Sequence, residues 1–257
     1  MKHLVRSAAA ALLASWAAAA NAGWSASLDL ERFRWQEDTN PSVTEVGPRI
    51  GLTLEYEQLR AAGWQFAYRG QFRYGTVDYT GSFLFTGGTA TARVEYTGLV
   101  NEAQGIYRFP GSSLGLELVG GLGWDYWQRN ILPDQKEDYS VLFLRAGLNV
   151  DPRARSGWFG GAGVKFPFYV SENAHLNEIG FDQNPRLEPK GEASPYAQLG
   201  YRFSPQWSLI GYYESYRFGE SNTVQTTNPA FPGTTFLIFQ PASRLEALGL
   251  RARYSFP

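Results

Sequence analysis

The chain of 257 residues contains no cysteine and few lysines: Lys accounts for four of its 23 basic residues. Without cysteine, disulfides cannot stabilise the fold. No block of like charge occurs and the net charge is −1, so we expect no nucleic-acid partner. Arginine suits fixed, multidentate ion pairs in confined places, and its excess over lysine favours such pairs here.

Long apolar runs are also missing. After residue 22, no stretch approaches 18 consecutive apolar residues, which excludes a membrane protein built from helices. The mean hydropathy of −0.31 does not oppose a membrane barrel, because a membrane strand alternates apolar and polar side chains. No composition break or linker divides the chain, which indicates a single domain.

The first 22 residues have the pattern of a cleaved secretory signal peptide. Lys2 and Arg6 supply the basic start, residues 7–20 an apolar run, and Ala20 and Ala22 the small residues at the cleavage positions. A retained membrane anchor is the alternative, but the run falls short of the roughly 20 residues that cross a bilayer. We therefore expect residues 1–22 to be removed and residues 23–257 to form the barrel domain described next.

Alternation of apolar and polar side chains recurs along residues 23–257, as expected for strands whose two faces meet different surroundings. Leu142, Leu144 and Leu148, for example, share one face, and Arg145 and Asn149 share the other. Ten such segments begin near Trp24, Val46, Trp64, Arg93, Leu114, Asp138, Trp158, Glu192, Trp207 and Ser243. We predict an all-β fold, a ten-stranded antiparallel up-and-down transmembrane β-barrel, with eight or twelve strands as alternatives.

The connections between these segments differ in length. Those after the even segments are short, at 60–63, 110–113, 151–156 and 204–206, whereas those after the odd segments include 78–92, 171–191 and 221–242. Short periplasmic turns and longer surface loops are typical of bacterial outer-membrane barrels. The pattern predicts an even strand number, periplasmic termini and a location in the Gram-negative outer membrane. Several segments exceed the roughly 9–11 residues that suffice for a crossing, so they should project beyond the membrane on the loop side.

Aromatic side chains gather at the ends of the predicted strands, as in the two interfacial girdles of a membrane barrel. A soluble barrel or sandwich has no reason to concentrate them at both edges. The predicted periplasmic girdle comprises Trp24, Trp64, Trp158, Trp207, Phe109, Phe203, Tyr254 and Phe256. The predicted outer girdle comprises Trp35, Tyr74, Tyr126, Trp127, Tyr139, Tyr169, Tyr196 and Tyr216.

The polar faces of the predicted strands carry charges of both signs. A barrel of this size encloses little free space, so these charges should pair across the interior. Full pairing would close the lumen, which we favour, whereas incomplete pairing would leave a narrow, weakly anion-favouring conduit. The predicted lumen network comprises Arg49, Glu55, Arg69, Arg73, Glu102, Arg108, Glu117, Arg145, Lys165, Arg202, Glu214, Arg251 and Arg253, with Asp29, Glu31 and Glu57 on the same faces.

The C-terminal Tyr254-Ser255-Phe256 resembles the aromatic-x-aromatic ending of bacterial outer-membrane barrels. This resemblance implies that the barrel-assembly machinery recognises Tyr254 and Phe256. Two features depart from that signal: Pro257 follows the terminal aromatic, and Arg251 occupies the position that usually carries glycine. In size and expected strand number, the chain is similar to the outer-membrane proteases called omptins and to ten-stranded neisserial adhesins.

A complete catalytic or metal-binding pattern is missing from the sequence. The omptin resemblance would require an Asp-His pair, but Asn173 stands two residues before His175, the one histidine after residue 22. An outer-membrane lipid A deacylase would show His-x-Ser, whereas Asn177 stands at that position. The acidic residues Asp134, Glu137 and Asp138 offer oxygen ligands for calcium but lack the glycine turn of such a loop. We expect no enzyme activity, no metal and no cofactor.

The expected role is that of a non-enzymatic outer-membrane protein, either structural or a narrow porin-like conduit. The runner-up is a surface-binding or adhesin-like barrel, because loop segments 221–242 and 78–86 contain apolar runs that would mark a contact site, fold into the mouth or extend the strands. The third hypothesis is a hydrolase that uses His175. Outer-membrane lipid and lipopolysaccharide are the expected partners, and a barrel without free strand edges should be a monomer.

Overall fold

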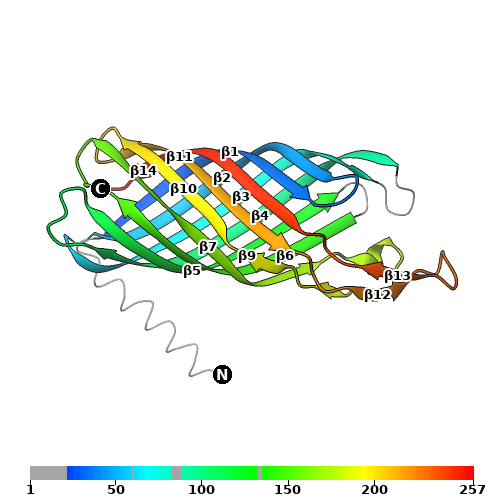
Figure 1. Cartoon of the computed structure of the whole chain (residues 1–257). Coiled ribbons are helices and arrows are strands. Elements are labelled where there is room, and N and C mark those ends of the chain that lie inside the picture. The colour runs from blue at the N-terminus through cyan, green and yellow to red at the C-terminus, as the bar shows by residue number, and fades with distance from the viewer. Residues whose placement is uncertain (1–21, 60, 83–87, 132–134) are drawn as a thin grey trace, which may run out of the picture.

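The structure, a computed structural model, describes residues 22–59, 61–82, 88–131 and 135–257, so the predicted signal peptide lies outside it except for Ala22. Ten long antiparallel strands form the wall of a closed barrel (Figure 1). Each pairs with the next wall strand along the chain, and the last pairs with the first. The wall strands are β1 (Ala22–Glu37), β2 (Val43–Gln58), β3 (Gly63–Ser82), β4 (Thr89–Arg108), β5 (Leu116–Ile131), β6 (Gln135–Val150), β7 (Gly157–Asn173), β10 (Ser194–Arg202), β11 (Trp207–Gly219) and β14 (Ser243–Ser255). The predicted ten-stranded up-and-down barrel is confirmed.

The predicted alternation of short and long connections is correct at one end and partly wrong at the other. The turn-end connections are short, and β1 begins and β14 ends at that end, where the Phe256 amide donates to the Trp24 carbonyl at 2.8 Å. At the loop end, however, β3 runs to Ser82 and β4 begins at Thr89, so most of the expected loop 78–92 is strand. Residues 38–42 suffice to join β1 to β2. The strands are longer than predicted because their alternation continues past the membrane-spanning part. The apolar run of the predicted loop segment 78–86, formed by Phe83, Leu84 and Phe85, lies outside the described residues, as does Thr86.

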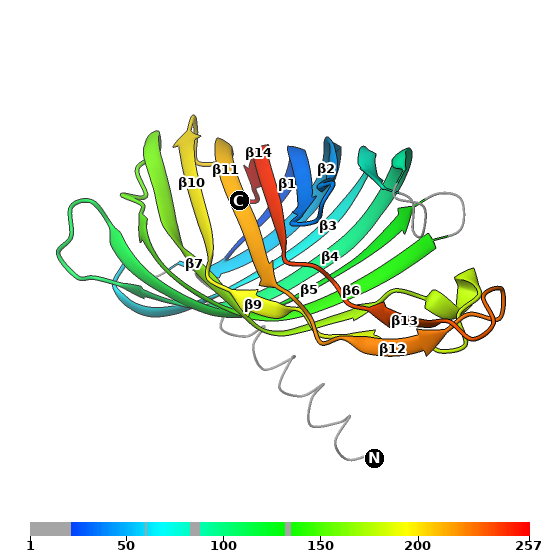
Figure 2. The ribbon, with the colours of Figure 1, turned by 45° about the vertical axis from the view of Figure 1, so that its right-hand side comes forward.

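Two longer connections at the loop end build a lobe outside the barrel (Figure 2). The first contains the 3-10 helix η2 (Leu176–Ile179) and the short strands β8 (Arg186–Leu187) and β9 (Lys190–Glu192); the second folds into the hairpin of β12 (Val224–Thr227) and β13 (Thr235–Ile238). Phe181 of the first connection packs edge-on against Phe236 of the hairpin. Segment 221–242 therefore forms a hairpin of its own, not a plug in the mouth. Among the described residues, no helix is long and apolar enough to cross a membrane.

The two faces of the wall exchange character along the barrel. Near the turns, outward side chains are apolar and inward ones are charged: on β1, Leu30 is 57% exposed and Asp29 is buried. A few residues later the pattern is reversed, because Arg34 is exposed on the outside and Trp35 is fully buried inside. We call the part with the apolar outer belt the membrane-spanning part, because its exposed surface suits lipid. The reversed part lies on its loop side.

The reversal corrects the predicted outer girdle, which is wrong for five of its eight aromatic residues. Tyr74 and Tyr169 face outward and are 39% and 38% exposed. The five that face the lumen are Trp35, Trp127, Tyr139, Tyr196 and Tyr216, each at most 7% exposed. The prediction placed these rings at the membrane interface because they are near strand ends. The face on which a side chain lies depends instead on whether its position along the strand is odd or even. Trp35 lies six positions after the inward Asp29 and shares its face.

The close packing inside the wall predicts a difference between two neighbouring glycines. A methyl group on Gly123, which faces the lumen, would collide with the ring of Phe143, whereas nothing lies within 4 Å of a methyl group on the outward Gly120. We expect Gly123→Ala to lower the free energy of unfolding by about 1–3 kcal/mol through overpacking, and Gly120→Ala to leave it nearly unchanged. The measurement is the temperature at which each refolded variant changes to unfolded migration on a detergent gel. Equal midpoints would contradict the packing.

Candidate functional site in the lumen

A layer of paired charges fills the lumen inside the membrane-spanning part; we call it the central network. Arg251 Nε lies 2.6 Å from Asp29 Oδ1, which joins β14 to β1. Glu214 lies 3.0 Å from Arg145 and 2.8 Å from Lys165. The network contains six basic side chains, Arg49, Arg69, Arg73, Arg145, Lys165 and Arg251, and six acidic ones, Asp29, Glu31, Glu55, Glu102, Asp125 and Glu214. Arg253 also reaches this network, 3.5 Å from Glu55. Each basic side chain therefore has a carboxylate partner, which lowers the cost of its burial.

A second set of ion pairs lies at the turn end. Arg108 Nη1 is 2.7 Å from Glu117 Oε1. The turn 151–156 folds beneath the barrel and places Arg153 Nη2 2.6 Å from Glu57 Oε1. Arg202 binds the carboxylate of Asp151, in the same turn, at 2.8 Å. A cavity of about 400 Å³ remains beside these residues, and its lining reaches inward as far as Arg69 of the central network.

Beyond the membrane-spanning part, apolar side chains occupy the lumen as an aromatic plug. Its members, each at most 4% exposed, are Phe33, Trp35, Val77, Val94, Tyr96, Val100, Trp127, Tyr139, Val141, Phe143, Val170, Tyr216, Phe218 and Leu245. Trp127 stacks on Tyr139 with ring centroids 5.0 Å apart and planes at 7°. Lys165 Nζ lies 3.7 Å from the ring centroid of Tyr216, a cation–π contact that joins the plug to the central network.

One guanidinium, that of Arg129, holds an acidic cluster at the outer end of the plug. Arg129 pairs with Glu45, lies 2.5 Å from Glu137 and 3.5 Å from Glu37. Glu172 is also buried there, and its Oε2 has no hydrogen-bond partner among the described residues. Burial raises the pKa of Glu172 well above its ordinary value, and the charge of Glu137 raises it further. Burial likewise raises the pKa of Glu137, although Arg129 opposes that shift.

All thirteen residues predicted for the lumen network take part in ion pairs in this structure. The sequence analysis missed Asp125, Asp151, Arg153, the Arg129 cluster and the whole aromatic plug. A signal for several of them was present: Asp125 and Arg129 stand at even separations from Glu117 on the same strand, so they share its inward face. Asp151 and Arg153 lie in a turn, where strand alternation gives no information.

The predicted periplasmic girdle lies on the outer surface at the turn end. Each of its four tryptophans contacts a tyrosine of the neighbouring strand, with ring centroids 5.0–5.3 Å apart; the pairs are Trp24–Tyr56, Trp64–Tyr107, Trp158–Tyr201 and Trp207–Tyr254. Phe109, Phe203 and Phe256 are exposed at the same edge, and Tyr254 is half-buried. Exposed rings that also carry a polar atom suit a membrane interface.

His175 lies outside the barrel, between two carboxylates. Its Nε2 is 2.7 Å from Asp138 Oδ2, and its Nδ1 is 3.0 Å from Glu178 Oε1. Partial burial of Asp138 raises its pKa, but hydrogen bonds from Gln128, His175 and Tyr126 outweigh burial and lower it. The two contacts place the ring as a bridge between Asp138 of β6 and Glu178 of η2.

The acidic residues considered for calcium do not converge. Glu137 and Asp138 are neighbours on β6 and face opposite sides of the wall, and Asp134 lies outside the described residues. Within the described ranges, no group of three or more His, Cys, Asp or Glu side chains is arranged to hold a metal ion.

The comparisons with known proteins give a fold but no family. No family model matches the chain, and no curated protein matches it. Among solved structures, the outer membrane protease OmpT from Escherichia coli is similar over 91% of this chain and 97% of that one, with a TM-score of 0.54 and 9% identity. The fold is that of an outer-membrane β-barrel.

Other outer-membrane proteins also match this barrel. The transport unit of the autotransporter AIDA-I from Escherichia coli matches over 90% of each chain, with a TM-score of 0.47 and 12% identity. Ail, the attachment invasion locus protein of Yersinia pestis, matches over 92% of this chain and 99% of that one, with a TM-score of 0.34 and 12% identity. At 9–12% identity, likeness to these solved structures shows the fold alone and assigns no activity to this barrel.

The Arg129 cluster predicts how stability changes with pH. A carboxyl group whose pKa is raised on folding contributes stability at low pH, and this is lost as the pH rises above its unfolded value near 4.5. We expect Glu172→Gln to remove this loss and to raise the unfolding midpoint at pH 8 more than at pH 4.5. At pH 8 the gain should be about 1–3 kcal/mol, the cost of a buried unsatisfied group.

The unfolding midpoint on a detergent gel, measured at both pH values, checks this prediction. Glu188→Gln is the matched control, because Glu188 is an exposed glutamate of the lobe. A loss of stability in Glu172→Gln at pH 8, or the same shift in Glu188→Gln, would show that Glu172 is not an uncompensated buried carboxyl group.

Proposed function

We propose that the chain is a closed, non-enzymatic barrel of the Gram-negative outer membrane, a structural protein that conducts no solutes. The observation that carries the proposal is the aromatic plug, whose members are each at most 4% exposed. A solute entering from the loop end would have to displace this plug and then separate the ion pairs of the central network. Ten strands give a bore too small for a water-filled channel around such side chains.

Further observations support a non-enzymatic protein that functions as a single chain. Both ring nitrogens of His175, the histidine considered for a hydrolase, are occupied by carboxylates. The wall pairs β14 with β1, so it presents no free strand edge to another copy. The rings of Tyr254 and Phe256 contact each other at the turn end of β14, where the barrel-assembly machinery would bind them.

The proposal predicts an electrically silent protein. Residues 23–257, refolded into a planar bilayer, should give no conductance steps under conditions in which a general porin gives them, because plug and central network block the lumen in series. Folded and heat-denatured samples must migrate differently on a detergent gel, which excludes silence through misfolding. Reproducible ion-selective steps from folded protein would contradict the closed lumen and favour the narrow conduit.

A second candidate function is surface binding through the lobe. The hairpin of β12 and β13 packs Phe236 and Ile238 against the η2 segment but leaves Leu237 and Phe239 60% and 41% exposed. Exposed apolar side chains on an outward projection are typical of contact sites. Binding by this lobe is compatible with a closed lumen, because the lobe lies outside the barrel.

Paired substitutions test this second function. We expect Leu237→Ser with Phe239→Ser to reduce the adherence of bacteria that display the protein to cultured cells, because those two side chains supply exposed apolar area. The matched control is Gln225→Ser on β12, which is also exposed. If the double variant reaches the surface, folds and adheres as well as the control, the lobe is not a binding site.

A further inference from the structure

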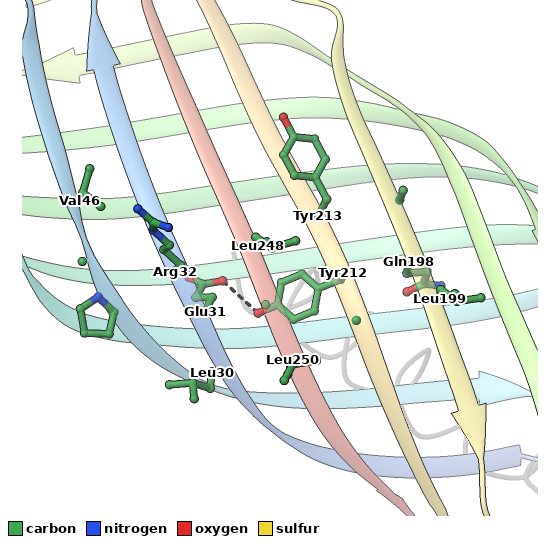
Figure 3. Close-up of a pocket in the computed structure, with 15 residues that line it drawn as sticks. Leu30, Glu31, Arg32, Val46, Gln198, Leu199, Tyr212, Tyr213, Leu248 and Leu250 are labelled. Carbon is green, nitrogen blue, oxygen red and sulfur yellow. Dashed lines mark hydrogen bonds between the residues drawn. The ribbon is translucent and has the colours of Figure 1, made fainter.

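A shallow groove of about 960 Å³ crosses the outside of the wall over β2, β1, β14, β11 and β10 (Figure 3). Its walls are mainly the outward apolar side chains of the membrane belt, among them Leu30, Leu199, Leu248 and Leu250. The groove therefore opens toward lipid. In Figure 3, Arg32 and Tyr213 lie above Leu30 and Leu250, so one end of the groove is polar.

The hollow has a simple origin in the sequence. β11 presents Gly211 outward between Leu199 of β10 and Leu250 of β14, so a strand without a side chain lies between two ridges. Beneath the groove, Tyr212 and Glu31 face the lumen and are joined by a hydrogen bond of 3.0 Å from the tyrosine hydroxyl. These inward contacts hold the strands that form the floor.

Four exposed arginines lie on the same outer face: Arg32 on β1 lines the polar end of the groove, and Arg34 on β1, Arg217 on β11 and Arg244 on β14 lie two to four residues further toward the loop end. Within the described part of the chain, neither Arg32 nor Arg217 nor Arg244 has a side-chain ion pair. Arg34 donates to Gln36 at 2.9 Å. Two acidic side chains are direct register partners of these arginines, Glu246 of Arg34 and Glu192 of Arg217, so four arginines stand with two carboxylates here. The Tyr213 hydroxyl donates to Glu246 at 2.9 Å.

Two of these arginines are placed where they repel each other. Arg217 and Arg244 are direct partners in the antiparallel pairing of β11 and β14. Like charges directly opposite on neighbouring strands destabilise the pair, and the surface around them keeps an excess of positive charge. An anion bound between them would remove that cost. Because the arginines spread over three adjacent strands, spaced about 4.8 Å apart, they can reach more than one anionic group.

We propose that this groove binds a multi-acyl glycolipid carrying phosphate groups, the lipid A part of lipopolysaccharide, with its acyl chains along Leu30, Leu199 and Leu250 and its phosphates at the arginines. The charge of the arginines matches phosphate, and guanidinium groups bind phosphate oxygens in bidentate fashion. Arg32 marks the loop-side end of the membrane belt, which is the outward end of such a barrel. The headgroups of the outer leaflet lie at that depth.

Two features favour this lipid over a phospholipid with two chains. The groove extends across five strands, which suits several acyl chains side by side, whereas two chains would fill part of it. The arginines are spread over three strands, which suits phosphates separated by a saccharide. The proposal is independent of whether the lumen conducts, because the groove lies on the outside of the wall.

The test is a titration of the refolded mature barrel in detergent, followed by native mass spectrometry, with three probes: bisphosphorylated lipid A, dephosphorylated lipid A and phosphatidylglycerol. We expect bisphosphorylated lipid A to bind most tightly. The double variant Arg32→Gln with Arg217→Gln should lower the affinity for bisphosphorylated lipid A about 25-fold, because each arginine near the membrane surface contributes about fivefold. Gly211→Phe should weaken the binding of every lipid that uses the groove, because the ring fills the groove. The wall tolerates this substitution, since the nearest atom to a Cβ added at Gly211 is 3.8 Å away.

Matched controls separate this site from the general lipid layer around a barrel. Gly120→Phe places the same ring on another outward glycine, and Arg93→Gln removes an exposed arginine of β4 that lies 4.0 Å from Asp78. Both should bind bisphosphorylated lipid A like the unmodified chain. Equal weakening by the control substitutions, equal binding of the dephosphorylated probe, or tighter binding of phosphatidylglycerol would each overturn the proposal. Detergent-gel migration confirms that every variant is folded.

Discussion

The small bore of a ten-stranded wall controls the arrangement of the other parts of the molecule. Side chains that point inward from one strand meet those of strands far away in the sequence, as Arg69 of β3 meets Glu214 of β11 at 3.5 Å. An ion left unpaired in such a space costs several kcal/mol, and water has little room to replace a missing partner. This cost explains why every basic side chain of the central network lies beside a carboxylate.

The same wall is built in two opposite ways along its length. In the apolar belt, apolar side chains cover the outside and charges fill the inside. Beyond it, polar and charged side chains cover the outside and aromatic rings fill the inside. The change occurs within β1 between Leu30 and Trp35, without a break in the strand. Each part follows the solvent around it, because the face that meets water becomes polar and the opposite face must be filled. The outer part is stabilised like a small soluble barrel, by an apolar core.

The exchange of faces also explains which predictions succeed. Alternation identifies all ten wall strands, and parity along each strand finds the charged lumen residues, because neither depends on which solvent surrounds the strand. The aromatic girdle at the turn end is correctly placed outside by the same parity, whereas five aromatic residues at the other end are not. These five residues were assigned to the membrane interface because they lie near strand ends. Trp35, however, is an even number of positions from the inward Asp29 and therefore also faces inward. Following the phase through residues 29–35 would have revealed the plug.

Alternation along single strands cannot predict contacts that depend on turns or on closure of the wall. Arg153 reaches Glu57 from a turn, and Asp138 meets His175 because two loop-end segments fold toward each other. The outer groove arises in the same way, since Gly211 becomes a hollow once β10 and β14 stand on either side of it. The plug and the central network fill the lumen except for the cavity at its turn end. Closure of the wall also creates surfaces on the outside of the barrel, and these carry the exposed arginines beside the groove, whereas the lobe carries exposed apolar residues.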